Sequence, residues 1–459
     1  MIFGIVESPD FAIINPSERA FMSVTTATIQ SSSTLFTENK SYLRRVILSC
    51  MIGNALEWYD FALYGYFATI IGQLFFPSVS VFASLMATFG VFAAGFIMRP
   101  LGGIIFGHIG DKVGRKNALL WSIYLMALPT ALIGLLPTYE QIGWLAPVLL
   151  TVIRLAQGLS MGGEFTGSMV FVVEHAPDHK RGLFGSWVVF SLVIGILVGS
   201  SIATTTCYTL TEDQLQTWGW RIPFILSVFG GFVGAFMRRA VDEPEQFKNA
   251  KKQHKTDATP LKEIYEHHLK GIGLVIMLDL TVAVGFYIIV TFIPNYMSAL
   301  LGWGKGESLM INTLSMIAMG SVIPFCGHLS DKFGRKPVLI PGALMFVVGA
   351  YPLFKILELS GLVPSLLAQI GLAAIMGVYF APIPATLLEF FPTEVRYSAL
   401  SIAHSTSMAI FGGSAPLVAT WLIHASDNYS APALYLALAA LISMIFVWKM
   451  VEHAQDHLE

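Results

Sequence analysis

One charged decapeptide occurs twice in this chain, and its two copies lie 220 residues apart. Residues 107–116 read Gly-His-Ile-Gly-Asp-Lys-Val-Gly-Arg-Lys, and residues 327–336 read Gly-His-Leu-Ser-Asp-Lys-Phe-Gly-Arg-Lys, so seven of the ten positions are identical. Each copy is a short charged turn between long apolar segments. A period close to half the chain indicates two copies of one large unit, because a solenoid would repeat a much shorter segment.

The composition is that of a membrane protein. Of the 459 residues, 55% are hydrophobic and only 12% are charged, whereas a soluble domain carries about 25% charged residues. The apolar segments reach about 20 residues, which is the length that a helix needs to cross a bilayer. They lack the alternation of apolar and polar residues that is typical of an outer-membrane β-barrel.

We predict an all-α fold of twelve transmembrane helices in two six-helix halves. The expected spans are residues 46–73, 81–106, 118–136, 144–173, 183–206 and 219–239, then 271–298, 308–327, 337–357, 363–391, 398–424 and 431–451. The corresponding division is a polar N-terminal segment (1–43), a first half (44–240), a cytoplasmic linker (241–270), a second half (271–451) and a short tail (452–459). Six acidic and six basic residues between Asp242 and Lys270 indicate that the linker is solvated.

Lysine and arginine residues gather in alternate loops, which the positive-inside rule places in the cytoplasm. We therefore expect both termini inside, in the cytoplasmic membrane of a bacterium. The first 40 residues hold no basic segment followed by an apolar one, so we expect no cleavable signal, and Met22 is an alternative start. The basic groups are Arg44 and Arg45; Lys112, Arg115 and Lys116; Lys180 and Arg181; Arg238 to Lys270; Lys332, Arg335 and Lys336; Arg396 and Lys449.

Several kinds of chemistry find no support in the sequence. Three cysteines, Cys50, Cys207 and Cys326, show no paired spacing, so neither a disulfide framework nor a metal site is indicated. The phosphate-binding Gly-x4-Gly-Lys-Ser/Thr loop of an ATP-driven pump does not occur. We expect no enzyme active site, no cofactor and no nucleic-acid partner, and we expect the protein to be a monomer.

Two features of the spans predict local geometry. Gly158 and Gly162, with Gly163 and Gly167, have the spacing that lets one membrane helix approach another closely, and such packing also suits a protein that changes shape. Pro382 and Pro384 lie inside one expected span, where each removes a backbone donor, so we predict a kink there.

Ionisable residues inside the spans are the candidates for function, because each costs about 2.5 to 3.5 kcal/mol to place at bilayer depth. Glu57, Asp60 and Tyr64 fall on one face of the first helix, with Asp60 near the midplane. In the fourth helix, three polar residues fall within about a 100° sector and so share a face: Arg154, Gln157 and Glu164. Arg99 lies in the second helix.

Two interpretations of these charges stay open. In the first, Arg99 and Arg154 neutralise the acids in a static network that only lets the bundle insert. In the second, an acid alternates between pairing with an arginine and holding a proton, because burial and a nearby cation move a carboxyl pKa in opposite directions. The second half is poorer in such groups, so we expect proton handling in the first half. The ionisable candidates in the second half are Asp279, Glu389 and His404, and we expect Tyr287 to line a cavity.

The duplicated turn resembles the loop signature of the major facilitator superfamily. Longer motifs resemble its metabolite:proton symporter family, which includes carriers for proline and betaine, α-ketoglutarate, citrate and shikimate. The resemblance spans residues 46 to about 451. The motifs are Gly53-Asn54-Ala55-Leu56-Glu57-Trp58-Tyr59-Asp60-Phe61, Met98-Arg99-Pro100-Leu101-Gly102-Gly103, Arg154-Leu155-Ala156-Gln157-Gly158 with Gly162-Gly163-Glu164-Phe165, Trp218-Gly219-Trp220-Arg221-Ile222-Pro223-Phe224 and Phe391-Pro392-Thr393-Glu394-Val395-Arg396-Tyr397.

What the resemblance implies is a proton-driven importer that works by alternating access. We expect proton coupling at Glu57, Asp60, Arg154 and Glu164, and substrate binding at Tyr64, Arg99, Gln157 and Tyr287. The two turns would act as cytoplasmic gates, the first against helix eleven and the second beside helix five. The gating residues would be Gly107, Asp111, Gly114, Arg115 and Lys116, and then Gly327, Asp331, Gly334, Arg335 and Lys336.

Alternatives to proton-coupled import also remain at this stage. An exporter or exchanger of the same fold would share all these motifs, because they encode mechanism rather than direction or specificity. A transport-silent nutrient receptor fits less well, since such proteins carry a large cytoplasmic extension. The substrate is expected to be a small organic acid or zwitterion, such as proline, betaine, or a di- or tricarboxylate, whose carboxylate suits an arginine.

Overall fold

The computed structural model describes residues 47–48, 50–112, 115–239, 264, 266–359, 361–452 and 454. Within these ranges, only the backbone is described for residues 107–112, 115–119, 237–239, 393 and 394. Residues 49–459 form one compact unit, and all of the structure below belongs to it.

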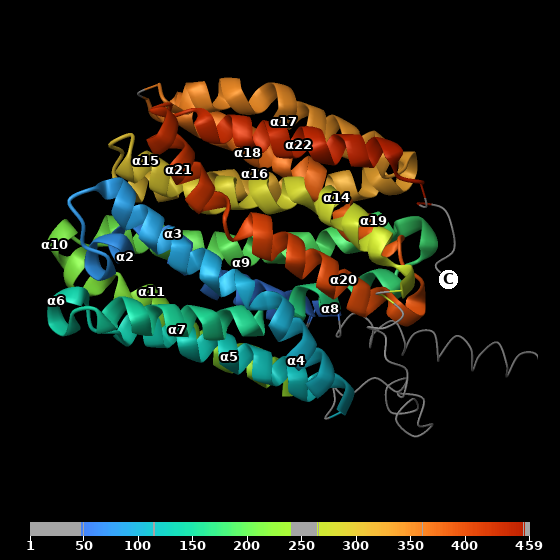
Figure 1. The fold of residues 1–459 in the computed structure, drawn as a ribbon, viewed down its shortest axis with the longest axis horizontal. Helices are drawn as coiled ribbons and strands as arrows, with labels where there is room; N and C mark the ends of the chain where they lie inside the picture. Colours follow the sequence, from blue (N-terminus) through green and yellow to red (C-terminus); the bar gives the residue numbers. More distant parts are fainter. Residues whose placement is uncertain are drawn as a thin grey trace, which may run out of the picture. The chain divides into compact units, whose positions relative to one another are not determined.

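The first half contains six spans, and three of them are divided into shorter helices (Figure 1). Two short helices, α6 (Tyr139–Ile142) and α10 (Glu212–Gln214), connect spans. In order, the spans are residues 50–66 with α2 (Ala68–Phe75), α3 (Val81–Ile97) with α4 (Arg99–Lys112), α5 (Arg115–Leu135), α7 (Leu145–Ser160) with α8 (Glu164–Glu174), α9 (Arg181–Thr209) and α11 (Arg221–Arg239).

The second half repeats this count. Its spans are α14 (Leu269–Tyr287) with α15 (Ile293–Ala299), α16 (Lys305–Phe333), α17 (Lys336–Leu357), α18 (Leu362–Phe380) with α19 (Ile383–Leu388), α20 (Thr393–Ser407) with α21 (Ala415–Ser426), and α22 (Ala431–Lys449).

Length and hydropathy support a membrane-spanning bundle. In the part of the chain that is described, nine helices are long and apolar enough to cross a bilayer. The other three spans are the helix over residues 50–75, the shorter apolar helix Leu120–Leu135 and a pair bent by 46°, Glu212–Gly219 with Arg221–Phe236. The predicted fold class, twelve helices in two halves, is confirmed. The proposed domain boundaries stay predictions, and segment 1–43 and most of linker 241–270 lie outside the described residues.

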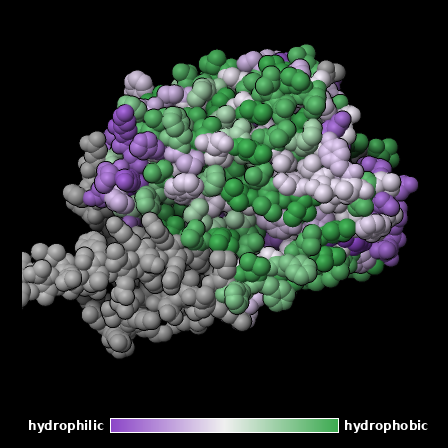
Figure 2. Space-filling model, turned by 180° about the vertical axis from the view of Figure 1, so that it is seen from behind, coloured by the Kyte–Doolittle hydropathy of each residue, from purple (hydrophilic) through white to green (hydrophobic). Residues whose placement is uncertain are grey.

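The molecular surface agrees with this assignment. Hydrophobic residues cover much of the face in Figure 2, and hydrophilic residues gather toward its two ends. Large apolar side chains point outward, among them Trp121, Phe236 and Trp448, whose exposed fractions are 63%, 76% and 72%. Since lipid tails are the natural neighbours of such side chains, these faces suit a bilayer.

Helix breaks are concentrated in a few spans. The fourth span breaks between Ser160 and Glu164, and π-helical turns interrupt the seventh span at Ile288–Phe292 and the eleventh at Met408–Gly412. The predicted kink in the tenth span is confirmed, because α18 ends at Phe380 and α19 begins at Ile383. Broken helices in membrane transporters free backbone and side-chain groups near the middle of the bundle.

Two spans of the first half cross at backbone contact. A Cβ atom on Gly158 would lie 1.8 Å from the carbonyl oxygen of Gly95, and one on Gly162 would lie 2.2 Å from the amide nitrogen of Gly103. The predicted close packing is confirmed for Gly158 and Gly162. Such a contact is available only to glycine, because no other residue leaves this space.

The glycine crossing gives a test of the packing. Gly158→Ala forces the second and fourth spans apart, and overpacking of this kind costs about 1–3 kcal/mol. We expect a lower melting temperature and less folded protein in the membrane, measured by size-exclusion and thermal denaturation in detergent. Gly90→Ala is the matched control, because a Cβ at Gly90 meets nothing within 4 Å. Equal stability of the two variants would contradict this account.

Candidate functional site

A buried arginine lies near the middle of the fourth span. Arg154 is 1% exposed and donates from Nη1 to Gln157 Oε1 at 2.7 Å, while Gln157 donates to the Thr130 hydroxyl at 2.6 Å. Its guanidinium lies over the Tyr64 ring at 4.4 Å, and the rings of Phe61 and Phe92 are about as close. Aromatic faces attract a cation, so this arginine is stabilised without a carboxylate.

A second buried arginine, Arg99, starts helix α4. It is 1% exposed and lies 5.3 Å from the Phe96 ring centre. Within the described residues, neither its Nε nor its Nη1 has a hydrogen-bond partner, and the same holds for the Tyr287 hydroxyl. Arg99 and Tyr287 come from different halves, yet they are close enough to interact electrostatically. Donors left without acceptors in a buried place are costly, so they point to a ligand that supplies acceptors.

Aromatic rings from both halves surround these two groups. Tyr287 contacts Trp58, Phe61, Phe92 and Phe96, with ring centres 5.1–6.3 Å apart. Eight aromatic residues are joined by ring contacts, and we call this set the central aromatic cluster. Its members are Trp58, Phe61, Phe92, Phe96, Phe165, Phe286, Tyr287 and Phe380.

Three carboxylates line one small cavity elsewhere in the first half. Glu57, Asp60 and Glu164 share it with Ser122, whose hydroxyl donates to Glu164 Oε2 at 3.3 Å. The cavity measures about 10 Å³, which is room for about one water molecule. Glu57 and Asp60 are one helical turn apart, so the cavity brings groups of like charge close together.

Arg99 and Arg154 form no ion pair with an acid in the part of the chain that the structure describes. Among those residues, Asp60 forms no ion pair within 4.0 Å either. The static network that neutralises the acids with Arg99 and Arg154 is therefore absent here. Both arginines contact aromatic rings instead. Arg154 lies against Phe61, Tyr64 and Phe92, and Arg99 lies against Phe96.

The second half contains a buried acid–histidine pair. Asp279 and His404 come from α14 and α20, and His404 Nδ1 lies 3.0 Å from Asp279 Oδ2. Both side chains are almost completely buried, and the His404 ring lies 5.2 Å from that of Phe165 in the first half. Sequence analysis named the two residues separately, because nothing in the sequence shows that spans seven and eleven meet at these positions.

The second copy of the repeated turn binds the start of a helix in the other half. Asp331 Oδ1 and Oδ2 accept from the backbone N–H groups of Gly182 and Leu183, at 2.7 and 2.8 Å, in the first turn of α9. A carboxylate at a helix N-terminus is favoured by the unpaired amides and by the helix dipole. The structure thus brings Asp331 beside the fifth span, where the gate was expected.

Arg335 joins that contact to a third helix. Its Nη1 donates to Asp331 Oδ1 and to the Ser330 hydroxyl, each at 2.9 Å, and its Nη2 donates to Glu389 Oε1 at 2.8 Å. Burial alone would lower the pKa of Arg335, but the attraction of Glu389 and Asp331 outweighs burial and raises it. The first copy of the turn has Gly110 where the second has Ser330, so that copy lacks this hydroxyl.

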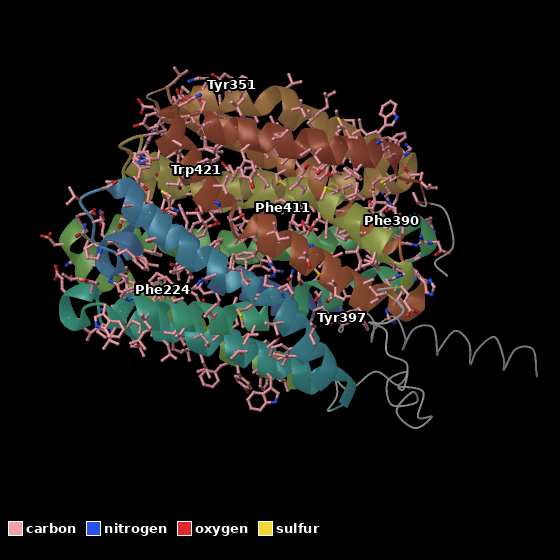
Figure 3. The ribbon with its side chains drawn as sticks, in the orientation of Figure 1. Phe224, Tyr351, Phe390, Tyr397, Phe411 and Trp421 are labelled. Carbon is pink, nitrogen blue, oxygen red and sulfur yellow. The ribbon has the colours of Figure 1, made fainter. Side chains whose placement is uncertain are left out.

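More residues close this end of the bundle, which we call the basic end. Glu452 accepts from the backbone N–H groups of Arg335 and Lys336 at the start of α17, at 3.0 Å each. Arg396 pairs with Glu174 of the first half at 2.9 Å. Tyr397, labelled in Figure 3 on α20, donates to the Gly163 carbonyl at 3.5 Å. Gly334 ends α16 at φ +100°, a conformation that favours glycine.

The opposite end of the bundle is closed as well. Asn295 Oδ1 accepts from the Thr69 hydroxyl at 2.9 Å and from Lys305 Nζ at 2.8 Å, and Asn295 Nδ2 donates to the Gly65 carbonyl. Asn312 donates to the hydroxyl of Tyr66 in the first half at 3.1 Å. Since the two halves touch at both ends, the structure shows an occluded state.

The predicted site residues thus fall into separate groups. Tyr64, Arg99, Gln157 and Tyr287 lie with Arg154 around the aromatic cluster, and Glu57, Asp60 and Glu164 line the acidic cavity. Gly327, Asp331, Gly334, Arg335 and Lys336 lie at the basic end, where a Cβ on Gly327 would lie 2.4 Å from the Ser186 hydroxyl. For the first copy of the turn, Gly114 and the side chains of Asp111, Arg115 and Lys116 lie outside the described residues, as does the surrounding of Gly107.

Several residues that the structure brings into these groups had no role predicted from the sequence. Trp58 and Phe61 belong to a motif quoted above, and their positions next to Glu57 and Asp60 on an interior helix were the available signal. Phe286, Arg181 and Glu452 carried none. Arg181 lies 3.6 Å from Glu389, a contact between fifth and tenth spans that no sequence pattern indicates.

Family models match both halves of the chain. Residues 46–270 match the model described as "Sugar (and other) transporter", and residues 275–459 match "Major Facilitator Superfamily". The fold is shared with solved structures of the xylose transporter XylE. A proton:xylose symporter structure bound to 6-bromo-6-deoxy-D-glucose gives a TM-score of 0.73 at 18% identity and covers 92% of this chain and 98% of its own. A partially occluded inward-open structure from E. coli gives 0.71 at 19%, with 90% and 98% covered.

Curated relatives are much closer in sequence. The glycine betaine/proline/ectoine/pipecolic acid transporter OusA of Dickeya dadantii is 37% identical over 428 residues, covering 91% of this chain and 85% of its own. The proline/betaine transporter of Escherichia coli K12 is 35% identical over 426 residues with the same coverage. A putative proline/betaine transporter of Staphylococcus aureus COL is 34% identical, covering 88% and 87%. This chain is therefore a multi-pass membrane transporter of the major facilitator superfamily, and it belongs to the family of these three relatives.

Proposed function

We propose that the protein imports a zwitterion of the proline or betaine type together with protons, by alternating access. The observation that carries this proposal is a set of buried donors between the halves, the Arg99 Nε and Nη1 and the Tyr287 hydroxyl, which have no hydrogen-bond partner among the described residues and are enclosed by aromatic rings. The names of the relatives at 34–37% identity support the substrate class.

The carboxylate of such a substrate fits Arg99. A guanidinium offers parallel donors that match a carboxylate, and hydrogen bonds between charged groups are shorter and stronger than neutral ones. Tyr287 adds a neutral donor from the opposite half. A carboxylate held between them bonds to both halves, so it favours the occluded state over either open state.

The ammonium end of the substrate fits the aromatic cluster. Tetraalkylammonium groups have no N–H to donate, and proteins recognise them by the faces of tryptophan, tyrosine and phenylalanine. Trp58 and Tyr287 stack at 29° with ring centres 6.3 Å apart, and Phe286 meets both rings edge-on. A di- or tricarboxylate, one of the original alternatives, gains nothing from such rings, so the cluster favours a zwitterion.

Proton coupling is assigned to the acidic cavity of Glu57, Asp60 and Glu164. Trp58 follows Glu57 and Phe61 follows Asp60 in the sequence, and both aromatic residues belong to the aromatic cluster. A proton that neutralises an acid on the first span therefore acts on the helix that also contacts the substrate. Proton binding and substrate binding are thus coupled through one helix.

Orientation and gating complete the proposal. The positive-inside rule places the basic end in the cytoplasm, so the contacts of Asp331, Arg335 and Glu389 close the inner gate. Asn295, Thr69 and Lys305 then close the outer gate. An exporter or exchanger would use the same gates, and vesicles of known orientation distinguish these directions.

Asp60→Asn tests the coupling. Wild-type protein in right-side-out proteoliposomes should accumulate labelled proline or betaine under an imposed inward pH gradient, and an uncoupler should abolish the accumulation. In Asp60→Asn we expect accumulation to fall about 100-fold or more, as for the loss of a proton-transfer group, while counterflow exchange persists. Exposed Asp427→Asn is the control. Equal loss of accumulation and exchange would contradict a proton role, and accumulation that needs no gradient would contradict symport.

Arg99 tests the carboxylate site. A buried hydrogen bond to a charged group contributes about 1.5–3 kcal/mol, so Arg99→Gln should raise the KM for proline and betaine by about 10- to 100-fold. Arg99→Lys keeps the positive charge but loses the parallel donors of the guanidinium, so its KM should lie between those of Arg99→Gln and wild type. The measurement is initial uptake with folding verified by size-exclusion. An unchanged KM in Arg99→Gln would place the carboxylate elsewhere.

Asp331 tests the inner gate. Asp331→Asn removes the charge that holds Gly182 and Leu183, so the basic end should open more often. Cys326 precedes Gly327 on α16 and is 5% exposed, and it serves as reporter once Cys50 and Cys207 are serine. We expect alkylation of Cys326 by a maleimide to become several-fold faster. Lys355→Gln breaks the exposed pair with Glu358 at the other end of the bundle. It should leave the rate of Cys326 alkylation unchanged. Unaltered alkylation in Asp331→Asn would count against the gate.

A further inference from the structure

The Asp279–His404 pair has an unusual property for a buried ion pair. Asp279 is completely buried, and His404 contacts only Oδ2, while Oδ1 has no hydrogen-bond partner among the described residues. Its one salt-bridge partner in that part of the chain is the histidine. Among the described residues no lysine or arginine pairs with this carboxylate, and a buried carboxylate without such a partner is costly in a membrane.

Neighbouring donors do not satisfy this oxygen. The Tyr379 hydroxyl of α18 donates to the Leu278 carbonyl at 2.7 Å, and the Ser443 hydroxyl of α22 donates to the Met277 carbonyl at 2.7 Å. Both hydroxyls bond to backbone carbonyls of the two residues that precede Asp279. A structural ion pair would gather such donors, since burial requires every lone pair to be satisfied.

The pair also lies against the proposed substrate site. The His404 ring packs on Phe165, and Phe165 contacts Trp58 with ring centres 6.2 Å apart. Asp279 and Arg99 both act electrostatically on the Tyr287 hydroxyl. Glu57 of the first half acts on the same hydroxyl, so the surroundings of Tyr287 combine the Arg99 cation with acids from both halves, and the two charged ends of a zwitterion each find an opposite charge there.

We propose that Asp279, positioned by His404, binds the cationic centre of the substrate while Arg99 binds its carboxylate. The proposal rests on the transport of zwitterions proposed above, and it adds a specificity residue in the second half. A secondary ammonium such as that of proline donates an N–H to Oδ1, whereas a quaternary ammonium is attracted by charge alone. Substrates with a carboxylate but no ammonium lose this interaction.

The test compares proline with tetrahydrofuran-2-carboxylate, in which an oxygen replaces the ring N–H. Each compound is added as an inhibitor of the counterflow of labelled proline in proteoliposomes. The readout is the ratio of the two inhibition constants. We expect wild type to favour proline by about tenfold or more, as for a desolvated charge pair. In Asp279→Asn the ratio should fall to within about threefold of one. Arg99→Lys is the matched comparison, because it should weaken both compounds and keep the ratio.

Each outcome is informative. A ratio unchanged in Asp279→Asn overturns the inference, even when overall affinity falls, because misfolding weakens both compounds alike. His404→Gln keeps a hydrogen bond to Asp279 and should retain discrimination, so loss of it there would show that the histidine itself carries selectivity and would overturn the assignment to Asp279. Should Asp279→Asn fail to reach the membrane, the double variant Asp279→Asn/His404→Gln, an amide pair, gives the same readout. Wild-type protein that carries neither proline nor betaine overturns the proposed function and this inference with it.

Discussion

Charge buried between two halves without a matching countercharge is the constraint on which this structure depends. Arg99, Arg154, Asp60 and Asp279 lie in the low-dielectric interior, yet among the described residues Arg99, Arg154 and Asp60 form no ion pair. A soluble protein would lose stability from such groups, because buried charges require partners. A carrier can tolerate them when substrate and protons supply the missing partners during each cycle.

The surrounding fold supports these charges in ways that also permit movement. Aromatic rings stabilise Arg154 by their faces, and rings can slide past one another without breaking directional bonds. Breaks in the fourth, seventh, tenth and eleventh spans lie in helices that contribute to the aromatic cluster or to the Asp279–His404 pair. At the basic end, Asp331 binds two backbone amides of another helix, a contact that ends when the halves rotate apart.

The sequence predicted the large-scale features well, for physical reasons. Spans of about 20 apolar residues mark helices in a bilayer, and the repeat at Gly107 and Gly327 identifies two halves. Pairings between distant spans could not be predicted, because Arg335–Glu389 and Asp279–His404 each depend on which helix faces which. Which of the two open interpretations of Arg99 and Arg154 applies could not be decided for the same reason, since helical spacing gives a face but not the neighbouring helix. Asp331 was predictable because its motif recurs as a unit.

The central claim is that a zwitterion bound between the halves moves together with a proton. The most direct measurement adds proline or betaine to right-side-out vesicles of wild-type protein with no imposed gradient and records the external pH. Symport predicts that the medium becomes more alkaline as substrate enters, at a rate that follows substrate uptake. Substrate entry without any pH change would contradict the account, as would acidification of the medium.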